Sequence, residues 1–209
     1  GWGLITIHSE NWPVSKIIRE IEKQGNVTVK SNLDPSSTAR MHVDQVPVGE
    51  ALESLAAATD SGWRLAYIYG PDKGKVNAAV SAYSAGESPE GWRTVFVPLG
   101  GGDMEFDPPS DPRRDVWNVH PPEERKLHAY LEQGAQSVAA AFAFPDSWNP
   151  DVSKEFKAGR VGKVAASIAS AAGGAVQEVF LLTRNRSRED RPDRTTDDPD
   201  AERRREAGA

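Results

Sequence analysis

The feature that most constrains the fold is an internal repeat, in which residues 46–70 align with residues 159–183 without a gap, at an offset of 113 positions. Few residues are identical, but the apolar positions coincide. The helical series Val48, Ala51, Leu52, Leu55 and Ala56 falls on Val161, Val164, Ala165, Ile168 and Ala169. This coincidence predicts two copies of one small module. Two unrelated alanine-rich helices, each followed by a strand, would align in a similar way, so that alternative stays open.

The first copy has a clear order of elements. Strands alternate apolar and polar residues, whereas helices repeat apolar residues at intervals of three and four. Proline opens both helices, and Gly25 ends the first of them. These signals predict strands over 4–8, 27–30, 39–43 and 63–69, with helices over 13–24 and 47–59. Residues 3–70 are thus expected to form a split β-α-β-β-α-β module in which two helices cover one face of a small sheet.

The run Val46-Pro-Val-Gly-Glu-Ala-Leu-Glu-Ser-Leu55 lies within this order of elements. The combination resembles the short N-terminal (STN) domain shared by secretins and TonB-dependent receptors. The resemblance covers about a third of the chain and rests on a hydrophobic pattern of moderate specificity. It implies a bacterial cell-envelope protein that makes protein–protein contacts, and it carries no catalytic residue to transfer.

The second copy is expected in residues 92–183, after a connector helix and linker in residues 71–91. Its predicted elements are strand 92–99, helix 123–138, strand 139–144, strand 152–157, helix 160–172 and strand 175–183. We matched its Gly134 to Gly25, which requires four extra loop residues. A Pro/Gly-rich insertion over 100–122 is expected to be irregular. The fold class is therefore α+β with two tandem modules; the competing possibility is one larger mixed sheet.

Composition restricts the function. The net charge of −6 belongs to residues 1–183, because residues 184–209 carry eight Arg and eight Asp or Glu. That segment holds no large apolar residue and is predicted to be a disordered, charged tail. An acidic body disfavours nucleic-acid binding. The chain contains no Cys, which excludes disulfides and thiolate chemistry, and no apolar run long enough to predict a transmembrane segment.

Gly159-Arg160-Val161-Gly162 precedes a helix and is followed by Lys163. A Gly-x-x-Gly loop of this kind clamps nucleic-acid backbones in KH domains, so single-stranded nucleic-acid binding through Gly159, Arg160, Gly162 and Lys163 is the alternative function. A simple turn into the helix is the competing explanation.

Three aromatic residues, Phe106, Trp117 and Trp148, fall in segments predicted to be irregular. Exposed aromatic side chains in loops often anchor partner proteins. The alternative, slightly favoured, is that the insertion folds back and packs these rings against the modules.

The four histidines show no metal-binding spacing, and His8 and His42 are expected on the solvent side of strands. The carboxylates between Asp103 and Asp115 lack the pattern of a calcium loop. We therefore expect no metal, cofactor or catalytic residue.

The sequence favours a non-catalytic interaction module whose partner is another protein, an envelope component. Its expected location is periplasmic or secreted, with a leader removed before Gly1; a cytoplasmic location is the alternative.

Overall fold

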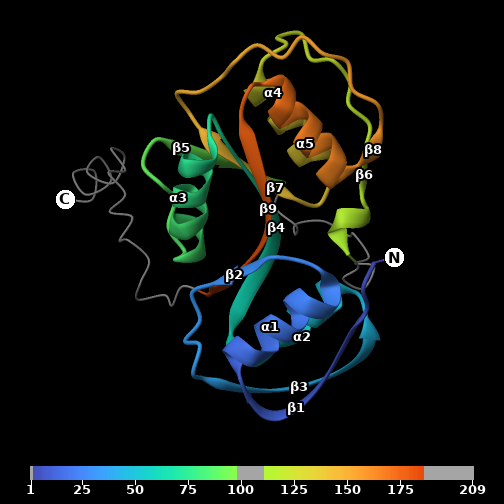
Figure 1. Ribbon diagram of the computed structural model, residues 1–209, viewed down its shortest axis with the longest axis vertical. Coiled ribbons are helices and arrows are strands. Elements are labelled where there is room, and N and C mark those ends of the chain that lie inside the picture. The colour runs from blue at the N-terminus through green and yellow to red at the C-terminus, as the bar shows by residue number, and fades with distance from the viewer. Residues whose placement is uncertain (1, 98–110, 186–209) are drawn as a thin grey trace, which may run out of the picture.

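The computed structural model describes residues 2–97 and 111–185 and forms a mixed α+β fold (Figure 1). The first half contains β1 (Ile5–Pro13), α1 (Val14–Gly25), β2 (Val29–Ser31), β3 (Thr38–Val46), α2 (Val48–Thr59) and β4 (Ser61–Gly70). It is followed by α3 (Lys73–Ser84) and β5 (Trp92–Val95). The second half contains a 3-10 turn η1 (Pro112–Arg114), β6 (Val116–Trp117), α4 (Leu127–Ser137), β7 (Ala141–Pro145), β8 (Gly159–Arg160), α5 (Val161–Ala171) and β9 (Ala175–Arg184).

The centre of the molecule is one five-stranded sheet that takes strands from both halves, in the order β2-β9-β4-β7-β5. The two long strands β4 and β9 pair antiparallel over their whole length and run from the part of the molecule that contains α1 and α2 to the part that contains α4 and α5 (Figure 1). The strand β2 pairs with β9 of the other half, and β7 pairs with β4. The two halves are therefore interleaved, whereas the sequence led us to expect a separate small sheet in each.

In each half, two helices lie between two sheets rather than on one face of a single sheet. In the first half, α1 and α2 contact the two-stranded sheet β1-β3 on one side and strands of the central sheet on the other (Figure 1). In the second half, α4 and α5 contact the central sheet through β7 and β9, and α5 also contacts β6 and β8. The prediction of one small sheet per module therefore missed the additional two-stranded sheets, β1-β3 and β6-β8.

The two halves correspond at a constant offset of 113 residues. The helix α1 begins at Val14 and α4 at Leu127, while α2 begins at Val48 and α5 at Val161. The strand registers follow the same offset: Val29 of β2 lies opposite Phe180, and Phe142 of β7 lies opposite Tyr67. The offset relates the two pairs residue by residue, because Val29 corresponds to Phe142 and Tyr67 corresponds to Phe180.

Local sequence explains where the helices begin and end. Pro13 and Pro47 stand directly before α1 and α2, where a fixed φ and a missing N–H cost nothing. Asn26 and Asp60 follow these helices in the left-handed conformation, with φ of 51° and 48°. The side chain of Asp72 accepts a hydrogen bond from the Lys75 amide at 2.9 Å and caps α3.

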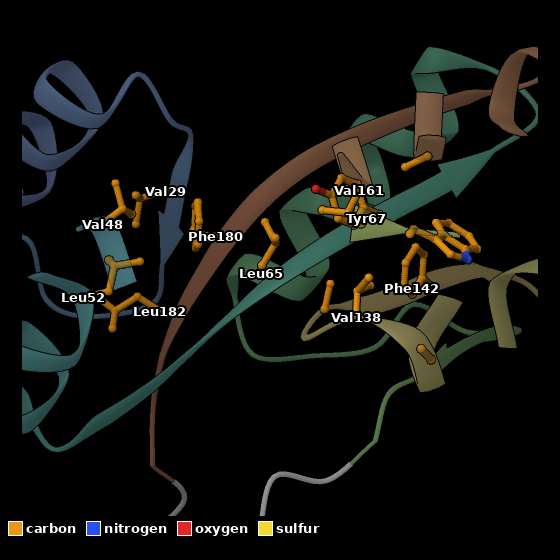
Figure 2. Packing of buried hydrophobic residues seen from close by; sticks show 14 of the residues in the cluster. Val29, Val48, Leu52, Leu65, Tyr67, Val138, Phe142, Val161, Phe180 and Leu182 are labelled. Atoms are coloured by element: carbon orange, nitrogen blue, oxygen red, sulfur yellow. The ribbon is translucent and has the colours of Figure 1, made fainter. Parts of the chain in front are cut away.

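The central sheet is buried on both faces. Alternate residues of its strands, among them Leu65, Tyr67, Phe142 and Phe180, join the main core against the four paired helices (Figure 2). The intervening residues, among them Ile68, form a second core under α3. The connector helix predicted over residues 73–84 is α3, and it covers this second face.

Two strand assignments of the second half are wrong. Residues 92–95 form β5, an outer strand of the central sheet beside β7, and the place of β1 is taken by the short β6 inside the predicted insertion. No strand spans 152–157. The strand β6, which pairs with β8, has only two residues, and Pro121 and Pro122 follow it closely.

The match of Gly134 to Gly25 is also wrong, because the constant offset places Val138 opposite Gly25. Gly134 lies inside α4 against the Trp117 ring. The strand β9 extends to Arg184, and residues 186–209 of the predicted tail lie outside the described residues, as do residues 100–110 of the insertion.

Candidate interaction surface

The strand β5 is a terminal strand of the central sheet, so one of its edges carries no strand within residues 2–97 and 111–185. The Asp146 amide donates to the Gly91 carbonyl at 2.8 Å, which continues the β5–β7 ladder past Trp92. Bonded and non-bonded pairs alternate in an antiparallel ladder, so Arg93 and Val95 direct their backbone groups at β7. The N–H and C=O of Thr94 therefore point to the outer edge.

Two hollows flank β5. A hollow of about 200 Å³ is lined by Thr94 and Phe96, with Ala66, Ala141 and Ala143 among its other walls. A wider groove of about 650 Å³ contains Trp92, Trp148, Pro71, Pro89 and Pro145, beside α3. Trp92, Thr94 and Phe96 alternate along the strand, so β5 contributes residues from one face to both hollows.

Two large apolar side chains are exposed where β5 ends: Phe96 at 49% and Val97 at 52%. The guanidinium of Arg64 lies 5.0 Å from the centre of the Phe96 ring. Exposed apolar residues beside a sheet edge and a hollow are typical of a surface that binds another chain. The sequence analysis did not single out this edge, because Trp92-Arg-Thr-Val95 was assigned to a strand inside a module.

Trp148, one of the predicted contact residues, lines the wider groove and is half-buried. Its carbonyl lies 2.7 Å from Nε2 of His128, whose ring packs on Phe144 at 4.3 Å. Arg93 forms ion pairs with Glu132 and Asp146 on the opposite face of β5. These contacts fix the backbone around Trp148, which also packs against the main core.

Trp117, a second predicted contact residue, is fully buried, so it belongs to the core and is not a surface anchor. Its ring stacks edge-on against Phe142, with centroids 5.4 Å apart. Within the described part of the chain, its indole N–H has no hydrogen-bond partner. Phe106, the third predicted contact residue, lies outside the described residues.

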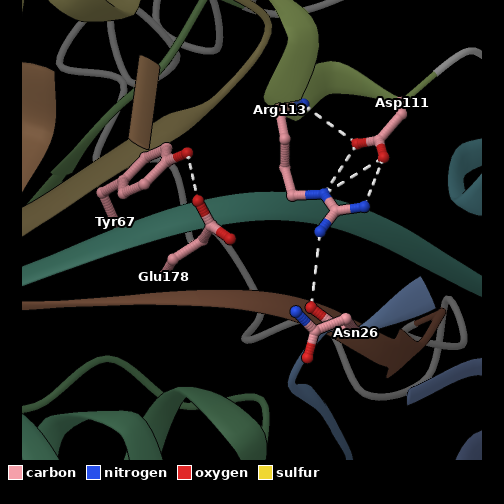
Figure 3. A network of polar contacts seen from close by, with 5 residues as sticks. All are labelled: Asn26, Tyr67, Asp111, Arg113 and Glu178. Carbon is pink, nitrogen blue, oxygen red and sulfur yellow. Dashed lines mark hydrogen bonds and ion pairs between the residues drawn. The ribbon is translucent and has the colours of Figure 1, made fainter. Parts of the chain in front are cut away.

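A polar cluster lies between the two halves (Figure 3). The Tyr67 hydroxyl on β4 donates to Oε2 of Glu178, directly opposite on β9, at 2.7 Å. Burial and the negative charge of Glu178 raise the pKa of Tyr67 well above its ordinary value. The 113-residue offset maps this pair onto Phe180 and Leu65, which also lie opposite each other. The pair Tyr67 and Glu178 is therefore polar, whereas the pair at the 113-residue offset is apolar.

The same region contains a buried ion pair. Oδ2 of Asp111 accepts from Nη2 of Arg113 at 2.5 Å, and both side chains are almost fully buried (Figure 3). Arg113 also donates to the Asn26 carbonyl at 3.4 Å, and its guanidinium lies 4.6 Å from the Trp2 ring centre. Because Asn26 follows α1, this pair connects the start of the second half to the first and is structural in character.

The predicted nucleic-acid loop is part of regular structure. Gly159 and Arg160 form β8, paired with β6, and Gly162 and Lys163 lie in the first turn of α5. Arg160 donates to the Arg114 carbonyl. A Cβ added at Gly162 would lie 2.7 Å from the Glu178 carboxylate, which occupies the space beneath the turn. A negative charge there opposes the approach of a phosphate.

The histidines and carboxylates lie as follows. His8 and His42 lie exposed on neighbouring strands, as predicted, with ring centroids 5.9 Å apart. Nε2 of His42 is 2.9 Å from Glu10. Asp115 accepts a hydrogen bond from the Ala139 amide, whereas Asp103 lies outside the described residues.

In the two described ranges, no three His, Asp or Glu side chains are placed to hold a metal ion. In the same ranges, no helix has the length and apolar character to cross a membrane.

Comparisons with protein-family models, with curated proteins and with solved structures find no match for this chain.

Proposed function

We propose that this protein is a non-catalytic interaction module of the bacterial cell envelope, and that it binds an extended segment of another protein along the outer edge of β5. The resemblance of residues 3–70 to the N-terminal domain of secretins and TonB-dependent receptors supports the envelope assignment. A periplasmic or secreted location accompanies it. The observation that carries the binding proposal is the terminal strand β5 with a hollow at each end.

Binding by strand addition draws affinity from main-chain hydrogen bonds and specificity from pockets for alternate side chains. Thr94 supplies an outward N–H and C=O for the main-chain bonds. The hollow at Phe96 and the groove at Trp92 lie on the same side of the strand. A bound segment with apolar residues at alternate positions would bury the exposed Phe96 and Val97 as well.

The duplication belongs to the same proposal: the two halves are diverged copies of one β-α-β-β-α-β module whose central strands interleave. The constant 113-residue offset of four helices and two strand registers supports it. The nucleic-acid alternative gains no support from the observed geometry, because its glycines lie in β8 and α5 over the carboxylate of Glu178.

Thr94→Pro tests the binding proposal, because it removes the outward N–H without touching the bonds to β7. A phage-displayed library of short linear peptides is selected on the intact chain, and the enriched peptides are titrated against variants. We expect the wild type and Thr94→Val to bind equally, since valine keeps the N–H. Thr94→Pro is expected to lose at least about tenfold in affinity.

Arg93→Pro is the structural control. It removes an N–H that bonds β7 and should lower the melting temperature, whereas Thr94→Pro should leave it nearly unchanged. Selection of no peptide, or peptides that bind Thr94→Pro as tightly as the wild type, would exclude the β5 edge. The envelope assignment is tested separately by fractionating cells that express the natural reading frame; recovery in the cytosol would refute it.

A further inference from the structure

The opposite edge of the central sheet, at β2, is equivalent to the edge of β7 that β5 covers. The two strands occupy matching registers, with Val29 opposite Phe180 and Phe142 opposite Tyr67. On β7, the strand β5 pairs antiparallel and places Val95 opposite Phe142. On β2, no strand is paired at this edge within residues 2–97 and 111–185. The outer edge of β7 is thus paired with an antiparallel strand, whereas the equivalent edge of β2 carries no strand in the part of the chain that the structure describes.

Backbone direction at β2 agrees with this equivalence. The Phe180 amide donates to the Thr28 carbonyl at 2.9 Å, so the alternation of a parallel ladder turns Thr28 and Lys30 toward β9. Val29 and Ser31 therefore direct their backbone groups outward. Phe142, the counterpart of Val29, directs its own at β5.

The outward N–H of Val29 is bound by a side chain. It donates to Oε2 of Glu22, near the end of α1, at 3.2 Å. The 113-residue offset places Ala135 of α4 at the position of Glu22, and Ala135 is 5% exposed. Beside the paired edge of β7, the helix α4 carries the short apolar residue Ala135. Beside the edge of β2, the helix α1 carries Glu22, whose carboxylate accepts the hydrogen bond of the Val29 N–H.

The helix α1, which lies beside this edge of β2, also carries an apolar residue that is only partly buried. Ile18 of α1 is only partly buried at the edge of the core, whereas its counterpart Leu131 of α4 is fully buried. The helix α4 contacts β5 directly. Strand addition at β2 would cover Ile18 in the way that Leu131 is covered in the other half.

We propose that the outer edge of β2 is a second binding site for an extended peptide, of the kind that β5 provides for β7, and that the Glu22 carboxylate closes it in the free protein. The occupant pairs antiparallel with residues 29–31. Its carbonyl oxygen replaces Oε2 of Glu22 at the Val29 N–H, and its alternate apolar side chains face Ile18. This site is independent of the outer edge of β5.

The test uses the full chain and an acetylated peptide that copies residues 90–97, Glu-Gly-Trp-Arg-Thr-Val-Phe-Val, which contains the strand already seated on β7. Fluorescence anisotropy measures binding to the wild type, Glu22→Gln and Glu22→Ala. We expect Glu22→Ala to bind the peptide at least about tenfold more tightly than the wild type, because no carboxylate has to be displaced. Glu22→Gln keeps an acceptor on the same stem and should bind with intermediate affinity.

Ser31→Pro, added to Glu22→Ala, locates the site. It removes the second outward N–H of β2 and should abolish the gain, while binding at β5 or β7 would be unaffected. A peptide of the same composition in scrambled order should not bind. Equal affinity of the wild type and Glu22→Ala, or a gain that survives Ser31→Pro, would overturn the proposal. Self-association of Glu22→Ala without peptide would show that a second copy occupies the edge, and would also overturn it.

Discussion

The polar pair Tyr67–Glu178 and its apolar counterpart Phe180–Leu65 allow a direct test of the correspondence between the halves. The change is Tyr67→Phe together with Glu178→Leu. It replaces the polar pair by the phenylalanine and leucine that stand at the equivalent positions, Phe180 and Leu65. Tyr67→Phe alone deprives a carboxylate of a 2.7 Å hydrogen bond and should cost about 1.5–3 kcal/mol. Glu178→Leu alone leaves a buried hydroxyl without its acceptor and should cost about 1–3 kcal/mol.

The double variant removes donor and acceptor together, so neither group is left unpaired. Replacing both partners of a buried hydrogen bond by apolar groups is nearly neutral, and we expect the double variant to lie within about 1 kcal/mol of the wild type. Urea unfolding of the four proteins gives the free energies and the coupling between the two sites. Arg113 keeps its own partner Asp111 in every variant, so no cation is orphaned.

Additive losses would refute this reasoning. If the double variant is destabilised by the sum of the two single changes, the site does not accept the apolar pair, and the register correspondence does not extend to packing. A matched control is Leu65→Ala, which creates a cavity in the first half and should cost about 2–5 kcal/mol without compensation by either change.

Three further outcomes are expected. Gly134→Ala should destabilise the protein by about 1–2 kcal/mol in thermal unfolding, because the added Cβ would lie 2.7 Å from the Trp117 ring and helix propensity offsets only part of that clash. Asp111→Ala should cost about 3–5 kcal/mol in urea unfolding, because it leaves a buried guanidinium unpaired. Burial raises the pKa of Tyr67 and Tyr69 in the folded state, so the unfolded chain loses these protons first. The free energy of unfolding should therefore keep its full value below about pH 10 and decrease above it. The tyrosinate absorbance of the two residues should appear together with unfolding.

The strands and helices themselves were largely predictable from sequence. The apolar stripe of α2 and α5, the prolines before α1 and α2, and the alternation in β4 are local signals, and each element formed where its signal lay. The burial of Leu65, Tyr67 and Tyr69 on one face of β4 followed from period-two alternation. The 113-residue offset was visible as well, since the core positions that it relates are apolar in both halves.

Strand pairing could not be predicted, because a hydrophobic pattern specifies which face of a strand is buried and leaves its neighbour open. Tertiary structure placed β2 beside β9 of the other half, and it placed β5 at an edge instead of at the start of a module. It also buried Trp117 in the core, an outcome that the sequence left open. Local sequence determines the elements of this protein, whereas the edges of the central sheet depend on pairings between residues that are 47 positions apart (Val95 and Phe142) to 151 positions apart (Val29 and Phe180).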